Sequence, residues 1–234
     1  MIYDLLRTHV PSMSELSLQT KEHSVKSQTS ASNFDSSDDE QGEVDLSPFY
    51  ISWLDLSFVG CDEPLGICAL PGCRFKDTWR SLENDIKCLV SEGVKELFCL
   101  CSKGELHKYR VPRLLDELSA ADINVHHTPF PDGQTPSTSD LINIVGDLQM
   151  LLMNGRKTVI HCYGGLGRSC FIAAALMMKL DGTLEADQAI TKLRELRGPG
   201  AVQSVKQYNC LHDLRQQIAD VDDDTEESNR SLSR

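Results

Sequence analysis

A cysteine followed by three glycines, set between two apolar runs, most restricts what this chain can fold into. Residues 159–170 read VIHCYGGLGRSC, and the second apolar run continues as FIAAALMMKL to residue 180. Continuous apolar runs of this length are typical of elements buried on both sides. The sequence therefore predicts a strand over 156–162, a glycine-rich turn and a buried helix over 170–180. Cys162 lies at the N-terminus of that helix.

Strand and helix patterns alternate along the rest of the chain. The β-branched and apolar segments predict strands over residues 49–56, 66–71, 94–101 and 123–130. The amphipathic segments predict helices over residues 76–93, 111–122, 135–155, 183–198 and 202–218, and a polar turn over 102–110. This order indicates an α/β fold with a central, mostly parallel twisted sheet and helices on both faces. Ligands bind at the carboxyl edge of such sheets, where Cys162 is expected.

Composition limits the domain count and the class of partner. The 234 residues suffice for one domain, expected over 46–219, and the Ser- and acid-rich segments 1–45 and 220–234 read as disordered tails. The net charge of -12 argues against nucleic acid or an anionic membrane as a partner. The N-terminal segment is not expected to act as a secretory signal, and the sequence has no run of about 20 apolar residues. Nine cysteines, an odd number, indicate reduced thiols in an intracellular protein of the cytoplasm, perinuclear region or nucleus.

The glycine-rich loop has the composition of an anion cradle. Glycines allow main-chain N–H groups to converge on one point, and the positive end of the following helix adds to their field. The guanidinium of Arg168 matches two phosphate oxygens. The residues expected to bind a phosphate are Tyr163, Gly164, Gly165, Leu166, Gly167 and Arg168.

The same field favours the thiolate of Cys162, so this residue is expected to attack phosphorus and form a phosphocysteine. Ser169 can donate its hydroxyl to the departing sulfur. His161 is expected to hold the loop backbone from behind. The plain alternative is a tight strand–helix turn with an incidental buried cysteine, but such a turn has no need of the arginine.

Phosphoryl transfer also needs a proton donor, and Asp132 in the loop FPDGQTP is the best candidate. That loop can move as a lid over the substrate. Asp-Gly is also a common turn pair, so Asp132 alone would read as a turn residue. Gln203 and Gln207 are four apart, on one face of the expected helix. Gln203 is a candidate for orienting the hydrolytic water, although glutamines on helix surfaces usually have no such role.

Other chemistries fit the loop poorly. A nucleotide-binding P-loop needs GxxxxGK[ST] and a dinucleotide fingerprint needs GxGxxG, and neither is present. A zinc site would need further ligands in register with Cys162. The sequence therefore predicts no metal and no organic cofactor. Cys101 could approach Cys162 and form a regulatory disulfide, although a role as buried filler is the simpler reading.

The segment HCYGGLGRS matches the HCxxGxxR[ST] signature of the cysteine-dependent protein phosphatases. Over residues 34–234 the chain resembles the dual-specificity members of this family, and among them the kinase-associated phosphatases. The resembling segments include GICALPGCRFKD, KGELHKYRVPRLLD and AVQSVKQYNCLHDLR. The resemblance implies a dual-specificity phosphatase fold and removal of phosphate from the activation-loop threonine of a cyclin-dependent kinase, gripped in part by the helix over 202–218.

The same resemblance implies that Cys162 is the nucleophile, Arg168 the phosphate clamp and Asp132 the general acid. Gln134 and Ser137 depart from the family's lid sequence, which puts the mobility of the lid in doubt. Two alternatives stay open: a kinase-binding or phosphoresidue-binding inhibitor without catalysis, and a broad tyrosine-specific phosphatase. An inositol lipid is a poor substrate for this loop because the loop lacks lysines.

Overall fold

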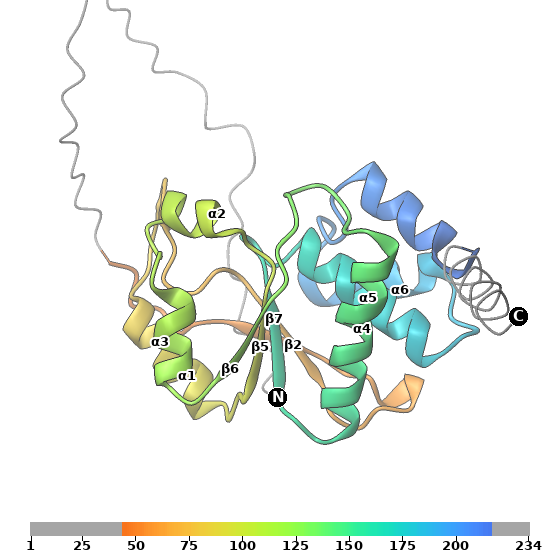
Figure 1. Ribbon diagram of the computed structural model, residues 1–234, viewed down its shortest axis with the longest axis horizontal. Helices are drawn as coiled ribbons and strands as arrows, with labels where there is room; N and C mark the ends of the chain where they lie inside the picture. Colours follow the sequence, from red (N-terminus) through yellow and green to blue (C-terminus); the bar gives the residue numbers. More distant parts are fainter. Residues whose placement is uncertain (1–43, 217–234) are drawn as a thin grey trace, which may run out of the picture. The chain divides into compact units, whose positions relative to one another are not determined.

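The structure, a computed structural model, describes residues 44–216 (Figure 1). Its central sheet has the strand order β1-β2-β7-β5-β6. These strands are β1 (Ile51–Leu54), β2 (Leu65–Cys68), β5 (Glu96–Cys99), β6 (Asn124–His127) and β7 (Thr158–His161). β1 is antiparallel to β2, and the other neighbouring pairs are parallel. The expected mostly parallel sheet is confirmed, and β7, which leads into Cys162, is its middle strand.

Helices cover both faces of this sheet, as expected (Figure 1). One face carries α1 (Leu82–Ser91), α2 (Lys103–Lys108) and α3 (Leu114–Ala120). The other carries α4 (Thr138–Met153), α5 (Arg168–Leu180), α6 (Ala186–Arg197) and a helix over 205–216. Smaller elements are the 3-10 turn η1 (Ser57–Val59) and the hairpin of β3 (Arg74–Phe75) and β4 (Thr78–Trp79).

The two faces of the sheet have separate apolar cores, and β7 contributes to both. Val159 packs on the α1–α3 side and Ile160 on the α4–α6 side, as the period-2 alternation of a strand requires. All of residues 168–178 of α5 are buried, because α5 lies against the sheet and between α4 and α6. This explains why the sequence of α5 is apolar on every side.

Two elements differ from the sequence-based expectation. Residues 103–108 form a helix, so the expectation of a polar turn there was wrong. Its N-terminus is a capping box, in which Ser102 Oγ accepts from Glu105 N at 3.2 Å and Glu105 Oε2 accepts from Ser102 N at 2.8 Å. The helix expected from residue 76 begins only at Leu82, because residues 74–79 form the hairpin and Ser81 caps the helix.

The expected tails, 1–45 and 220–234, lie almost wholly outside the described residues. Asp45 is described, and it forms an isolated bridge with Arg80. No helix within residues 44–216 is long and apolar enough to cross a bilayer.

Candidate active site

The loop over residues 162–167 joins β7 to α5 at the carboxyl edge of the sheet, where a functional site was expected. Cys162 is 2% exposed and directly follows the last residue of β7. α5 begins at Arg168, with Gly167 as its N-cap. The thiol, the glycines and the start of a helix are therefore brought together as the sequence predicted.

Arg197 of α6 holds the glycine part of this loop from outside. Its Nη2 donates to Gly164 O at 3.0 Å and its Nε to Gly165 O at 3.3 Å. Its Nη1 donates to Ser52 Oγ at 3.0 Å, which anchors the guanidinium on β1. Arg197 thus fixes two carbonyl groups in an outward direction.

The neighbouring carbonyls are also held outward. Tyr163 O accepts from Leu70 N at 2.9 Å, and Leu166 O accepts from Val202 N at 3.0 Å. In a trans peptide the N–H points away from the C=O of the same unit. With the carbonyls of residues 163–166 turned out, the N–H groups of residues 164–167 face the interior of the loop. This is the geometry of an anion nest.

Gly165 is the position in the loop where a side chain is excluded. Its φ is +67°, and a Cβ there would lie 2.4 Å from the carbonyl oxygen of Cys68. The loop therefore packs directly on the end of β2, and this contact needs glycine.

Arg168 is fully buried, and its guanidinium is held by two main-chain carbonyls and the carboxylate of Glu105. Nη1 donates to Leu100 O at 2.9 Å, Glu105 Oε2 at 3.0 Å and Phe130 O at 3.1 Å, and Nη2 donates to Glu105 Oε1 at 2.7 Å. Burial is the largest single effect and acts to lower the pKa of Arg168, but the hydrogen bonds to Glu105 together with the Coulombic contributions of Cys101, Cys162 and Glu105 outweigh it and raise the pKa. The remaining donor, Nε, is buried and makes no hydrogen bond within the described residues. It can therefore donate to an anion in the loop.

Asp132 faces this free donor. Its Oδ1 is 3.2 Å from Arg168 Nε, an ion-pair distance without hydrogen-bond geometry. The Asp132 side chain is 64% exposed. It lies in a turn in which Gln134 N donates to Pro131 O at 3.1 Å and Gly133 has a φ of +70°. The structure thus brings the candidate acid to the mouth of the loop, on a turn of the kind that Asp-Gly favours.

The helix over 205–216 holds this turn through Gln134. Lys206 Nζ donates to Gln134 Oε1 at 2.6 Å, and Gln207 Nε2 donates to Gln134 O at 3.3 Å. The side chain of Gln134 thus links the turn that carries Asp132 to this helix, and the bond from Gln207 to the main-chain oxygen of Gln134 adds a second link that does not depend on the side chain. Gln203 precedes the helix, so the expectation that it shares a helix face with Gln207 was wrong. Gln203 still lies against the loop, because a Cβ on Gly167 would be 2.8 Å from its Oε1.

Two further buried polar groups belong to the residues that flank the loop. Ser169 Oγ and His161 Nε2 have no hydrogen-bond partner among the described residues. His161 Nδ1 is 3.3 Å from Cys162 O, so this ring contacts the backbone at the start of the loop. Burial lowers the pKa of His161 to about 4, which keeps the ring neutral near pH 7.

The side chain of Tyr163 points away from the nest, into an aromatic cluster. Its ring stacks on Tyr109 at a centroid distance of 4.4 Å, and Phe75 meets the two rings edge-on at 6.3 and 5.2 Å. Tyr163 can therefore bind an anion only through its backbone, while its ring fixes the first turn of the loop.

The thiols of the neighbouring strand are buried and stay protonated. Burial raises the pKa of Cys99 to about 12 and also raises the pKa of Cys101. Cys101 Sγ is 3.9 Å from Arg168 Nη2. A disulfide between Cys101 and Cys162 stays a prediction. Within residues 44–216, no group of three or more His, Cys, Asp or Glu residues is placed to hold a metal ion.

Sequence reasoning missed two residues that shape the site, Glu105 and Arg197. The pattern SKGE at 102–105 is a capping-box signal and would have placed Glu105 in the first turn of a helix. Its contact with Arg168 depends on the packing of α2 on the sheet, which no local pattern shows. No sequence pattern predicted a role for Arg197, because it resembles the other charged residues near the end of a helix.

Comparisons with known proteins place the chain in a family. A family model described as Cyclin-dependent kinase inhibitor 3 (CDKN3) matches residues 23–190. A protein named Cyclin-dependent kinase inhibitor 3 from Homo sapiens is 49% identical to this chain over 203 residues. The protein of the same name from Rattus norvegicus is 48% identical over 204 residues. Each match covers 87% of this chain and 96% of the relative.

A solved structure resembles the chain over most of its described part. It is a kinase-associated phosphatase in which the catalytic-site cysteine is replaced by serine. The two are 50% identical with a TM-score of 0.73, and the match covers 75% of this chain and 98% of the other.

Proposed function

This chain belongs to the cyclin-dependent kinase inhibitor 3 family and is a protein phosphatase. We propose that it hydrolyses phosphothreonine on the activation loop of a cyclin-dependent kinase. Phosphoserine and phosphotyrosine are further substrates of the same dual-specificity site. This substrate makes the enzyme a cell-cycle regulator of the cytoplasm or nucleus. One observation carries the proposal: a buried thiol begins a loop whose carbonyls are held outward, and Arg168 Nε makes no hydrogen bond among the described residues.

In the first step, the Cys162 thiolate attacks phosphorus while the N–H groups of residues 164–167 and Arg168 bind the non-bridging oxygens. The bond between phosphorus and the threonine oxygen breaks, and Asp132 gives its proton to that oxygen. The products are a phosphocysteine and the free hydroxyl of the kinase. Because Asp132 reaches Arg168 Nε at 3.2 Å, substrate phosphate displaces it from that contact and leaves it beside the leaving group.

In the second step, water attacks the phosphocysteine. Asp132, now ionised, takes a proton from this water, and Gln203 orients it from its position against Gly167. The sulfur–phosphorus bond breaks and inorganic phosphate leaves. Ser169 Oγ, buried and unpartnered among the described residues, donates to the departing thiolate.

The kinase is expected to bind partly on the helix over 205–216. Val205 is 75% exposed and Tyr208 is 37% exposed, so this helix presents apolar groups to a partner. Lys206 lies between them and contacts the lid at Gln134. A partner on this helix would thus sit next to the turn that carries Asp132.

Phosphate release tests the proposal. The substrate is a cyclin-dependent kinase phosphorylated on its activation-loop threonine, incubated with wild type, Cys162→Ser and the control Cys88→Ser. The Cys88 thiol lies away from the loop and donates to Phe49 O at 3.4 Å, a bond that serine can replace. We expect release by wild type and Cys88→Ser, and none by Cys162→Ser.

The other outcomes separate the alternatives. Binding of the kinase by all three proteins without release would favour a non-catalytic inhibitor. Release from phosphotyrosine peptides alone would favour a tyrosine-specific phosphatase.

A further inference from the structure

The chain contains three Ser/Thr-Pro pairs, beginning at Ser47, Thr128 and Thr135. They differ in access. Thr128 Oγ1 is buried and Thr135 is half-buried, whereas Ser47 is exposed. Ser-Pro is the acceptor motif of proline-directed protein kinases, which need an accessible hydroxyl followed by proline. Within residues 44–216, Ser47 is the exposed hydroxyl that meets both requirements.

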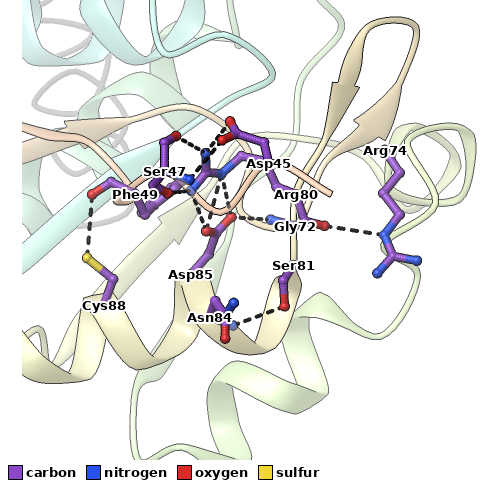
Figure 2. A network of polar contacts seen from close by, with 10 residues as sticks. All are labelled: Asp45, Ser47, Phe49, Gly72, Arg74, Arg80, Ser81, Asn84, Asp85 and Cys88. Atoms are coloured by element: carbon purple, nitrogen blue, oxygen red, sulfur yellow. Dashed lines mark hydrogen bonds and ion pairs between the residues drawn. The ribbon is translucent and has the colours of Figure 1, made fainter. Parts of the chain in front are cut away.

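The Ser47 hydroxyl also faces a cation. Figure 2 shows the guanidinium of Arg80 between Asp45, Ser47 and Asp85. Arg80 Nη1 donates to Asp45 Oδ2 at 2.9 Å and to Ser47 Oγ at 3.3 Å, and Nη2 donates to Ser47 O at 2.9 Å. A phosphate on this oxygen would form within reach of a charged donor.

Arg80 is anchored from the opposite side. Asp85 accepts from Arg80 Nε at 3.0 Å and from Nη2 at 2.8 Å, and it also accepts from Gly72 N at 2.8 Å. The Asp85 side chain is 1% exposed, against 48% for Asp45. Asp85 therefore keeps its place, and Asp45 is the carboxylate that a new anion can displace.

We propose that Ser47 is a phosphorylation site for a proline-directed protein kinase and that Arg80 receives its phosphate. The Ser47 oxygen attacks the γ-phosphorus of ATP, the bond from that phosphorus to the bridging oxygen of ADP breaks, and the hydroxyl proton passes to the kinase's base. The phosphoserine carries a charge of about -1.5 to -2 and three strong acceptor oxygens. It takes Nη1 of Arg80 from Asp45 and ties the segment before β1 to the domain.

The chain holds an internal control for this site. Asp45-Leu46-Ser47 recurs as Asp55-Leu56-Ser57. Both serines are exposed, and each N–H donates to the preceding aspartate, at 2.8 and 2.9 Å. Ser57 is followed by Phe58, so it shares the local turn and lacks the proline.

The first experiment measures phosphate incorporation. The full chain carrying Cys162→Ser is incubated with ATP and a cyclin-bound cyclin-dependent kinase as the proline-directed kinase, and the sites are mapped by mass spectrometry. This background prevents the chain from removing its own label, so the result is independent of the proposed phosphatase function. We expect phosphate on Ser47, at least tenfold less after Pro48→Ala, and no change after Ser57→Ala. An unlabelled Ser47, or equal labelling with and without Pro48, would overturn the site.

The second experiment tests the role of Arg80 by phosphorus NMR. A phosphate paired with Arg80 loses its second proton at lower pH than solvated phosphoserine, whose pKa is about 6. Asp45→Asn removes the competing carboxylate and should lower the midpoint further. A phosphoserine that titrates like the free amino acid in both proteins would contradict binding by Arg80.

Discussion

The carboxylate of Glu105 bonds both terminal nitrogens of Arg168, with Oε1 2.7 Å from Nη2 and Oε2 3.0 Å from Nη1. This bidentate pair fixes the guanidinium plane of a side chain that is wholly buried. With both terminal nitrogens engaged, Nε is the donor that makes no hydrogen bond among the described residues, and it lies 3.2 Å from Asp132 Oδ1. In the proposed mechanism Arg168 binds phosphate, and Glu105 would hold the opposite side of its guanidinium during that step.

Glu105→Gln should therefore weaken both folding and catalysis. The variant removes the carboxylate that pairs with both terminal nitrogens of Arg168 and leaves only the exposed carboxylate of Asp132 near this buried charge, which lowers the free energy of unfolding by about 3 kcal/mol. The loosened guanidinium should lower kcat/KM at least tenfold. Denaturant unfolding and phosphate release measure the two effects. The control is Glu117→Gln, which breaks a surface pair with Arg113 and should change stability by under about 1 kcal/mol. Equal effects of the two variants would refute the role of Glu105.

Arg197→Lys should lower activity while the domain stays folded. A lysine keeps the charge but cannot bond Gly164 O, Gly165 O and Ser52 Oγ together, so the carbonyls lose their outward hold. We expect kcat/KM to fall about tenfold, with an unchanged circular dichroism spectrum. Arg194→Lys, at an exposed position one turn earlier, is the matched control and should retain wild-type kinetics.

The part of the fold that could be predicted from sequence is the part governed by local pattern. The apolar run before Cys162 and the glycines after it fix a strand, a turn and a helix within one short segment. The mostly parallel sheet was predicted from the alternation of strand and helix patterns. Asp132 was selected as a candidate because an Asp-Gly turn follows a predicted strand. Each of these signals lies within a few neighbouring residues.

The rest of the site depends on contacts between distant segments. Glu105 reaches Arg168 across 63 residues, and Arg197 reaches Gly164 across 33. Neither contact can be recognised from sequence periodicity or composition, because a single charged residue on a helix is usually interpreted as exposed to solvent. The hairpin over 74–79 was missed for a related reason: its two strands are two residues each, too short to show alternation.

Gly165→Ala should destabilise the protein, whereas Gly164→Ala should not. An added Cβ at Gly165 meets the carbonyl of Cys68 at 2.4 Å and also forces a φ of +67° on an L-residue. At Gly164 nothing lies within 4 Å of the added atom. We expect a loss of about 2 to 5 kcal/mol for the first and under about 1 kcal/mol for the second, measured by urea unfolding. An equally small loss of unfolding free energy at both positions would show that the loop relaxes around a side chain at Gly165.

Stability should fall below pH 6.5 because of His161. Its pKa is about 4 in the folded protein and about 6.5 when unfolded, so between these values the unfolded chain binds the extra proton. The free energy of unfolding therefore decreases as the pH drops through this window, by about 3 kcal/mol in all. His161→Gln should flatten the profile. His107→Gln, at an exposed position of α2, keeps His161 and should keep most of the slope. A profile that His161→Gln leaves unaltered would contradict this.

Asp132→Asn should slow the hydrolysis of poor leaving groups selectively. The amide keeps the turn but has no proton to give, so a threonine-like alkyl phosphate must depart as an alkoxide. An electron-poor aryl phosphate needs no such proton. We expect kcat/KM to fall about a hundredfold or more for the alkyl ester and only a fewfold for the aryl ester. Asp140→Asn is the control, because Asp140 is exposed at the start of α4, where Ser137 Oγ donates to it at 2.6 Å. If Asp132→Asn slowed both esters by the same small factor, Asp132 would be a turn residue and the proton would have to come from another group.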